Sequence, residues 1–464
     1  MAGPSNSIIQ GIYTRDFGLK LSDIALFIVI ARLFDAFTDP FIGYLSDRTR
    51  GWMAGRKGWL VLGMCLSLFA IHLLYFPPQQ VTPTYFFVAF TLCYLGWTLI
   101  EIPHLAWGAE ITDSYDDRSR IFSIRMGFVF VGMLIFLAIP LLLAAYEHYS
   151  TGAPFAGLST QYSRETLRVA FWTVAVLFPL TIAAAICFVP RGRSPVLAPK
   201  HMDLRALIAM FRDNKPMMFF AAVLFLCGLA FGMQVALAYL HLSSYLQLAE
   251  QASIIYVVCY PLNILGIPIW LRVARTRGKH VAFAVGTGLS GLLFIVLGFL
   301  TPGEWAFAGY FATFALLQLC TAAWLALPQA ILSDISDYGT LRSGEDRSAT
   351  YFSFFVFFNK CFNGLGGAVG FGIAAYFGFD PSLIQHDAAS SFGVRLVMGF
   401  LPAVLVLVAA FFIMRFPLDR QRHDIIRRRL EQLAARRERA AATTASGAMK
   451  EMTAEIEMRP SATR

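Results

Sequence analysis

The chain has 464 residues, of which 57% are hydrophobic and 14% are charged, and its net charge is +9. Soluble proteins carry roughly 25% charged residues, so this composition excludes an ordinary soluble protein and indicates one that crosses a membrane many times. The basic residues lie in short segments between apolar windows and in the tail, which argues against a nucleic-acid partner.

Apolar windows follow one another along most of the chain. A hydrocarbon core about 30 Å thick requires ~20 apolar residues per helix. We expect eleven full spans, at about 22–46, 58–76, 84–110, 121–145, 166–189, 216–240, 250–273, 280–300, 304–332, 350–377 and 392–416.

The residues before Thr14 are too few to cross a membrane, and they lack the basic start of a signal peptide. One interpretation is an eleven-span protein with an external N-terminus. The interpretation we prefer is the outer half of a further helix whose inner half is missing from the sequence.

Clusters of Arg and Lys follow alternate windows, and the intervening connections contain almost none. The positive-inside rule therefore places the clusters and the C-terminus in the cytoplasm, which predicts a multi-pass protein of a cell inner or plasma membrane.

The longest polar interruption between spans divides the chain near its middle. The segment "IPHLAWGAEITDSYDDRSR" in the first half is similar to "LPQAILSDISDYGTLRSGEDRS" in the second. Paired halves of this kind are typical of secondary transporters. We predict an all-α polytopic membrane protein with a helix bundle at 1–189, a cytoplasmic linker at 190–215, a six-helix bundle at 216–416 and a cytoplasmic tail at 417–464.

Acidic residues within the first full window are the strongest functional signal. An ionised group inside a membrane is costly unless it is paired or faces water, so it marks a candidate site. Asp35 and Asp39 are one helical turn apart, with Thr38 beside them, and together they offer oxygen ligands to a monovalent cation or a proton. The alternative is a static ion pair between Asp35 and Arg32.

Lys360 lies about ten residues into the tenth window, too deep to reach water easily. We expect it to pair with Asp35 or Asp39 and to be displaced when a cation binds. A permanent structural salt bridge is the alternative.

Glu101, Arg125 and Trp324 are candidates for binding a polar solute. A carboxylate near an aromatic ring is common in sugar sites, because the carboxylate accepts hydroxyl hydrogen bonds. Arg125 lies where it can pair with Glu101 or bind a ligand, so an internal ion pair is the alternative. Trp324 is the weaker candidate, because a Trp in a helix bundle is usually part of the core.

These residues resemble the glycoside-pentoside-hexuronide:cation symporters, a branch of the major facilitator superfamily related to the melibiose permease. The motifs are "RLFDAFTDPFIGYLSDRT", "GRKGW", "EIPHLAWGAEIT", "DDRSRIFSIR" and "SDISDYG", with a lone Lys before a Gly-rich run. The resemblance implies a major facilitator fold with a partial first helix. By the same resemblance, Asp35, Thr38, Asp39 and Thr98 hold the coupling cation, Glu101 and Arg125 bind the sugar, and Lys360 communicates with the cation site.

We therefore expect a cation-coupled symporter for a sugar or glycoside that works by alternating access, with Na⁺, Li⁺ or H⁺ as the coupling ion and no cofactor. No enzymatic site appears in the sequence, and we expect a monomer in the lipid bilayer. The alternatives are a transporter of a lysolipid or other amphiphile, because Leu105 replaces a tryptophan of the family, and a non-transporting membrane sensor or scaffold.

Overall fold

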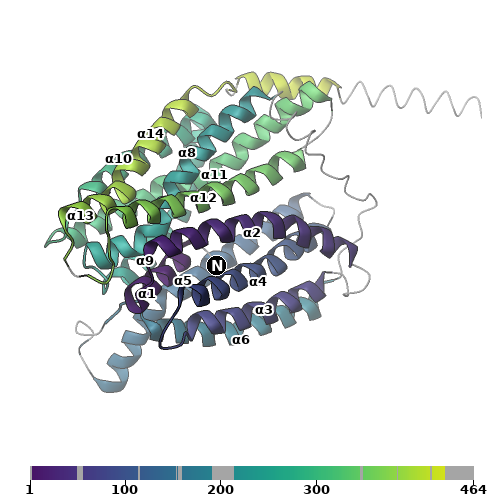
Figure 1. Ribbon diagram of the computed structural model, residues 1–464. Helices are drawn as coiled ribbons and strands as arrows, with labels where there is room; N and C mark the ends of the chain where they lie inside the picture. The colour runs from purple at the N-terminus through teal and green to yellow at the C-terminus, as the bar shows by residue number, and fades with distance from the viewer. Residues whose placement is uncertain are drawn as a thin grey trace, which may run out of the picture.

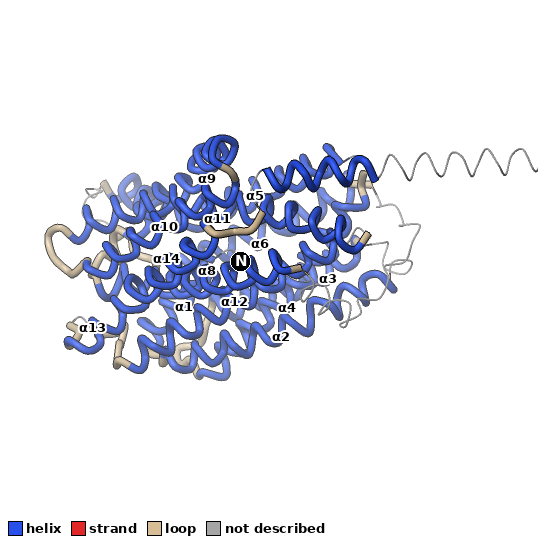
Figure 2. The backbone as a smooth tube through the Cα atoms, turned by 90° about the horizontal axis from the view of Figure 1, so that it is seen from above, coloured by secondary structure: helices blue, strands red, loops and turns tan. Residues whose placement is uncertain are grey.

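The structure is a computed structural model that describes residues 3–49, 56–112, 115–152, 154, 159–190, 214–344, 348–383, 385–418 and 421–433. All regular elements within these ranges are helices (Figure 2). In the first half they are α1 Gly3–Phe17, α2 Leu21–Arg48, α3 Lys57–Tyr75, α4 Pro83–Glu110, α5 Tyr115–Thr151 and α6 Arg164–Phe188. In the second half they are α8 Lys215–Leu240, α9 Ala252–Arg277, α10 Lys279–Phe299, α11 Ala306–Ser343, α12 Ser348–Tyr376, α13 Ala388–Arg395 and α14 Leu401–Met414.

Two π-helical turns interrupt the regular helices of the second half. The first, His241–Tyr245, extends α8, and the second, Leu396–Phe400, joins α13 to α14. With these turns included, every apolar window predicted from the sequence coincides with a helix. The predicted all-α membrane fold is therefore confirmed.

Hydropathy alone identifies most of the spans. Of the helices described, nine are long and apolar enough to cross a membrane. The helices α2 and α12 are not among these nine, and they carry Asp35, Asp39 and Lys360. Because charged residues inside a span are costly, these two helices need partners within the protein.

The helices form two groups, which Figure 1 shows one above the other. In one group α4 packs against α2 and α3, and α3 packs against α6; in the other, α8 packs against α12 and α14, and α10 against α9, α11 and α14. The groups meet where α12 packs against α2, α1 against α8, and α5 against α9. Most of the predicted linker lies outside the described residues, so the exact domain boundaries stay predictions.

Helices α8 and α12 approach each other almost backbone to backbone. A Cβ atom placed on Gly232 would lie 2.2 Å from the carbonyl oxygen of Asn363, and one on Gly366 would lie 2.3 Å from that of Leu229. Only glycine fits at such positions, so α8 and α12 interlock over this region.

The helix α1 is short but is fully part of the core. Ile8, Ile9, Ile12 and Tyr13 are completely buried, and the Tyr13 hydroxyl donates a hydrogen bond to the carbonyl oxygen of Leu74 at 2.6 Å. It begins near the middle of the molecule, as Figure 1 shows, and leads directly into α2.

The chain continues after α14 into a helical segment, residues 421–433, that docks on α11. His423 Nε2 lies 3.0 Å from a carboxylate oxygen of Asp337 and 3.3 Å from one of Asp334, while Ile426 is buried. This arrangement fixes the start of the predicted tail against the second group of helices.

Candidate functional site

The helix α2 carries the first three predicted site residues, Asp35, Thr38 and Asp39. Asp35 is buried, with 5% of the residue exposed, and the Thr38 hydroxyl donates a hydrogen bond to the carbonyl oxygen of Phe34 at 3.0 Å. The helix continues through Pro40 without a break. Asp35 and Asp39 therefore keep the one-turn spacing that places both carboxylates on one face.

Lys360 of α12 pairs with Asp39, and this ion pair connects the two halves of the protein. The Lys360 Nζ atom lies 2.6 Å from Asp39 Oδ2, with 35% of the lysine and 24% of the aspartate side chain exposed. The other oxygen, Asp39 Oδ1, is buried and accepts no hydrogen bond from the residues described.

Thr98 lies on α4 at the level of Asp39. The helices α2 and α4 run in the same direction, since Arg56 binds Asp47 near the end of one and Glu110 at the end of the other. A Cβ atom on Gly43, one turn after Asp39, would lie 3.7 Å from a side-chain carbon of Ile102, one turn after Thr98. The buried Thr98 thus belongs to the same layer of the bundle as Asp39.

Glu101 forms an ion pair with Arg125 of α5. The Arg125 Nη2 atom lies 2.5 Å from both carboxylate oxygens of Glu101, and about one fifth of each side chain is exposed. Glu101 is three residues after Thr98, so the two share a face of α4. His104 of α4, which was not among the residues predicted for the site, interacts electrostatically with both Arg125 and Glu101.

Trp324 lies in an aromatic cluster of the second half rather than beside these acids. Its ring is stacked on Phe283, with centroids 5.8 Å apart, and contacts Phe231 at 5.4 Å. These contacts fit the core role that is usual for a Trp in a bundle. The side chain of Arg32 lies outside the described part of the structure.

A network of hydrogen bonds joins the two halves at the end of the molecule where α1 meets α2. Arg15 donates to the hydroxyl of Tyr239 at 3.2 Å and to the carbonyl oxygen of Tyr162 at 3.0 Å. The Ser253 hydroxyl donates to the carbonyl oxygen of Leu137 at 2.7 Å. Thr160 also donates to the carbonyl oxygen of Glu250.

The opposite end of the molecule has ion pairs within each half. Arg56, whose side chain is 6% exposed, binds Asp47 at 2.6 Å and Glu110 at 2.8 Å in the first half. Lys279 binds Asp334 at 2.6 Å in the second half. Each of these three ion pairs therefore lies within one half of the protein.

The sequence profile of one transporter family matches almost the whole chain. This profile, described as MFS/sugar transport protein, matches residues 6–420. The chain belongs to this family. It is therefore a multi-pass membrane transporter of the major facilitator superfamily and not an enzyme, as the sequence predicted.

Several known transporters are distant relatives of the chain. It is 23% identical to the uncharacterized symporter YjmB of Bacillus subtilis strain 168, covering 87% of this chain and 86% of that protein. It is 23% identical to the sodium-dependent lysophosphatidylcholine symporter 1-B of Danio rerio, covering 91% and 85%. It is 20% identical to the glucuronide carrier protein homolog of Escherichia coli strain K12, covering 89% and 88%.

The fold of the transporter matches solved structures of the superfamily. A bacterial homolog of the human lysosomal transporter Spinster, in an inward-facing and unoccupied conformation, is 15% identical with a TM-score of 0.62. The match covers 89% of this chain and 94% of that one. At this identity the similarity supports the fold alone, and it confirms the predicted major facilitator architecture.

Proposed function

We propose that this transporter is a symporter that couples the movement of a monovalent cation to that of a sugar or glycoside. The observation that best supports this proposal is the ion pair between Lys360 and Asp39, which joins the two halves of the protein. Asp39 lies one helical turn from the buried Asp35. In the absence of the cation, the lysine neutralises Asp39. A bound cation takes over this role, releases Lys360 and so changes the contact between the halves.

The ligand chemistry around Asp39 suits a hard monovalent cation or a proton. Two carboxylates one turn apart, with the hydroxyls of Thr38 and Thr98 in the same layer, provide oxygen ligands only. We propose these four residues as the cation ligands and leave Na⁺, Li⁺ and H⁺ as the candidate ions. The transport assay described below measures which of these three ions drives uptake.

The proposed solute site lies next to the cation site on α4. Glu101 offers a carboxylate that accepts hydrogen bonds from hydroxyl groups, and Arg125 offers donors. In the structure Glu101 and Arg125 form an ion pair with each other at 2.5 Å. A polyhydroxylated solute would therefore bind by replacing this ion pair with hydrogen bonds from its hydroxyl groups to Glu101 and Arg125. His104 is a third candidate for contact with the solute.

We propose that the transporter works by alternating access and as a monomer. The network around Arg15, Tyr239 and Ser253 closes one end of the interface between the halves. The many basic residues at the opposite end favour its location in the cytoplasm. We infer that the conformation is closed on the outer side and that entry of the solute requires this network to open.

A lysolipid is the second candidate solute. The similarity to a lysophosphatidylcholine symporter extends over 91% of the chain, which is as much as the similarity to the sugar carriers. Leu105, where the sugar-transporting family has a tryptophan, makes the proposed solute site more apolar and favours an amphiphile.

Transport into proteoliposomes tests both candidates. Purified protein is reconstituted, and uptake of a labelled glucuronide and of labelled lysophosphatidylcholine is measured with and without a Na⁺ or H⁺ gradient. We expect gradient-driven accumulation of the glucuronide, reduced more than tenfold in Asp39→Asn. Asp47→Asn, on the same helix but outside the proposed site, is the matched control and retains transport.

The outcomes of this assay separate the alternatives. Gradient-driven uptake of the lysolipid but not of the glucuronide identifies the amphiphile as the solute. Uptake that is indifferent to every cation gradient and to Asp39→Asn contradicts the coupling mechanism.

A further inference from the structure

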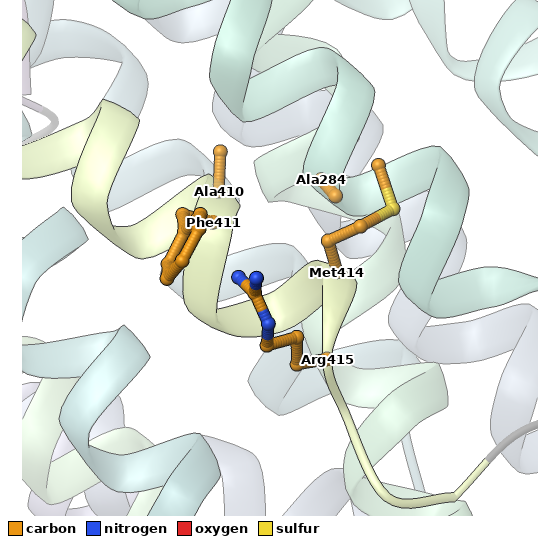
Figure 3. Close-up of a pocket in the computed structure, with 5 residues that line it drawn as sticks. All are labelled: Ala284, Ala410, Phe411, Met414 and Arg415. Carbon is orange, nitrogen blue, oxygen red and sulfur yellow. The ribbon is translucent and has the colours of Figure 1, made fainter.

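A groove lies between α10 and α14, away from the interface between the two halves. Ala284 of α10 and Ala410, Phe411, Met414 and Arg415 at the end of α14 line this groove, whose volume is about 580 Å³ (Figure 3). The alanines leave the space between the two helices open here. Further along, the helices close together, because a Cβ atom on Gly291 would lie 2.7 Å from the side chain of Leu407.

The groove opens onto a surface that faces lipid. Phe411 is 58% exposed and Met414 50% exposed, and one face of α14 continues with the exposed side chains of Val408 and Val404. Exposed apolar side chains on a membrane-spanning helix contact the acyl chains. The stripe from Val404 to Arg415 is about 16 Å long at the helical rise. This length matches one leaflet of a hydrocarbon core about 30 Å thick.

Arg415 places a positive charge at the end of this apolar stripe. Its guanidinium carbon lies 3.6 Å from the centroid of the Phe411 ring, so the side chain turns back along α14 into the groove (Figure 3). An arginine at a membrane boundary usually extends its charge toward water. None of the carboxylates that the structure describes forms an ion pair with Arg415. The guanidinium therefore lies on the Phe411 ring at the end of the apolar stripe rather than in an ion pair with a described carboxylate.

We propose that this groove binds an anionic glycerophospholipid. The guanidinium of Arg415 holds the phosphate, since its planar donors match phosphate oxygens, and an acyl chain lies over Phe411, Val408 and Val404. Lys215 adds positive charge to the same corner, because Phe219, one turn after it, contacts Phe412 and Phe416. Positive charge near the boundary favours an anionic over a zwitterionic headgroup.

This lipid site is separate from the proposed solute path. The helix α14 packs against α8 and α10, and the groove lies on their outer surface. A lipid held here contacts only the second half of the transporter. Its binding therefore does not depend on the identity of the transported solute.

Native mass spectrometry of the full-length protein tests the proposal. The purified transporter is mixed with equal amounts of phosphatidylglycerol and phosphatidylcholine in mild detergent, and the retained lipid is identified. We expect preferential retention of phosphatidylglycerol, reduced roughly fivefold in Arg415→Ala. Arg428→Ala, which removes another exposed arginine on the helical segment 421–433, is the matched control and is expected to retain the lipid.

A second variant fills the groove and keeps the charge. Ala410→Phe is expected to reduce retention of both lipids, while gel filtration confirms that the protein is folded. Equal retention of phosphatidylglycerol in wild type, Arg415→Ala and Ala410→Phe overturns the proposal. A dimer that dissociates in Ala410→Phe overturns it as well, because the groove would then be covered by a second copy of the chain.

Discussion

Replacing Lys360 by methionine is expected to tighten cation binding and to uncouple it from transport. The lysine and the cation compete for Asp39 in the proposed mechanism, so removing the lysine charge leaves Asp39 free for the cation. Methionine has a similar length and no charge, which limits the change in packing against α2.

The structure sets the size of this effect. At the observed separation of 2.6 Å, Coulomb's law gives about 1.6 kcal/mol in water and about 6 kcal/mol at an effective dielectric constant of about 20. Both side chains are partly exposed, and separating them restores part of their hydration, so the lower part of this range applies. We expect about 1.6–2.8 kcal/mol, roughly a fifteenfold to hundredfold decrease in the cation dissociation constant.

Isothermal titration calorimetry of the purified protein with Na⁺ and Li⁺, and with pH jumps for H⁺, measures this change. Lys279→Met is the matched control, because Lys279 also lies 2.6 Å from a carboxylate, that of Asp334, but outside the proposed site. The control is expected to keep the wild-type cation affinity. A folded Lys360→Met protein whose cation affinity stays within twofold of wild type refutes competition between the lysine and the cation.

Three further predictions concern the solute site, the closed end and the fold. Arg125→Lys keeps the charge but loses the planar donors, so we expect at least a tenfold higher KM for the transported solute in proteoliposome uptake, with cation binding unchanged. Ser253→Ala removes the hydrogen bond to the carbonyl oxygen of Leu137. We expect a cysteine introduced between the halves to react faster with an external membrane-impermeant reagent in this variant. An unchanged reaction rate argues against a role of this hydrogen bond in closing the outer end of the interface. Asp387→Ala removes the N-cap side chain that accepts a hydrogen bond from the Ser390 amide at 2.9 Å, and we expect a lower Tm than that of the wild type.

The sequence predicts the helices of this protein well because each must satisfy the same requirement of length and hydropathy. It also predicts that Lys360 and the acids of α2 have partners, since charges inside a membrane need them. It left Asp35 and Asp39 as equal candidates for that partner. The choice of Asp39 depends on the rotation and depth of α2 relative to α12, which hydropathy does not encode.

Other contacts could not be predicted from the sequence for similar reasons. Arg56 belonged to a basic cluster that indicates orientation, yet the structure buries it against Asp47 and Glu110. The bonds from Arg15 and Ser253 end on backbone carbonyl groups of distant segments. Such acceptors exist at every residue, so no sequence pattern marks them.

The close packing of Gly232 against Asn363 has a mechanical consequence. Because α8 and α12 interlock there, we expect them to turn together as one rigid unit in the proposed transport cycle. Lys360 lies on α12, and Tyr239, whose hydroxyl accepts a hydrogen bond from Arg15, lies on α8 about 20 Å further along the direction of the two helices. In the proposed cycle, a small rotation that follows the release of Lys360 from Asp39 is then expected to reach the hydrogen bond between Arg15 and Tyr239 without a separate signal between the two places.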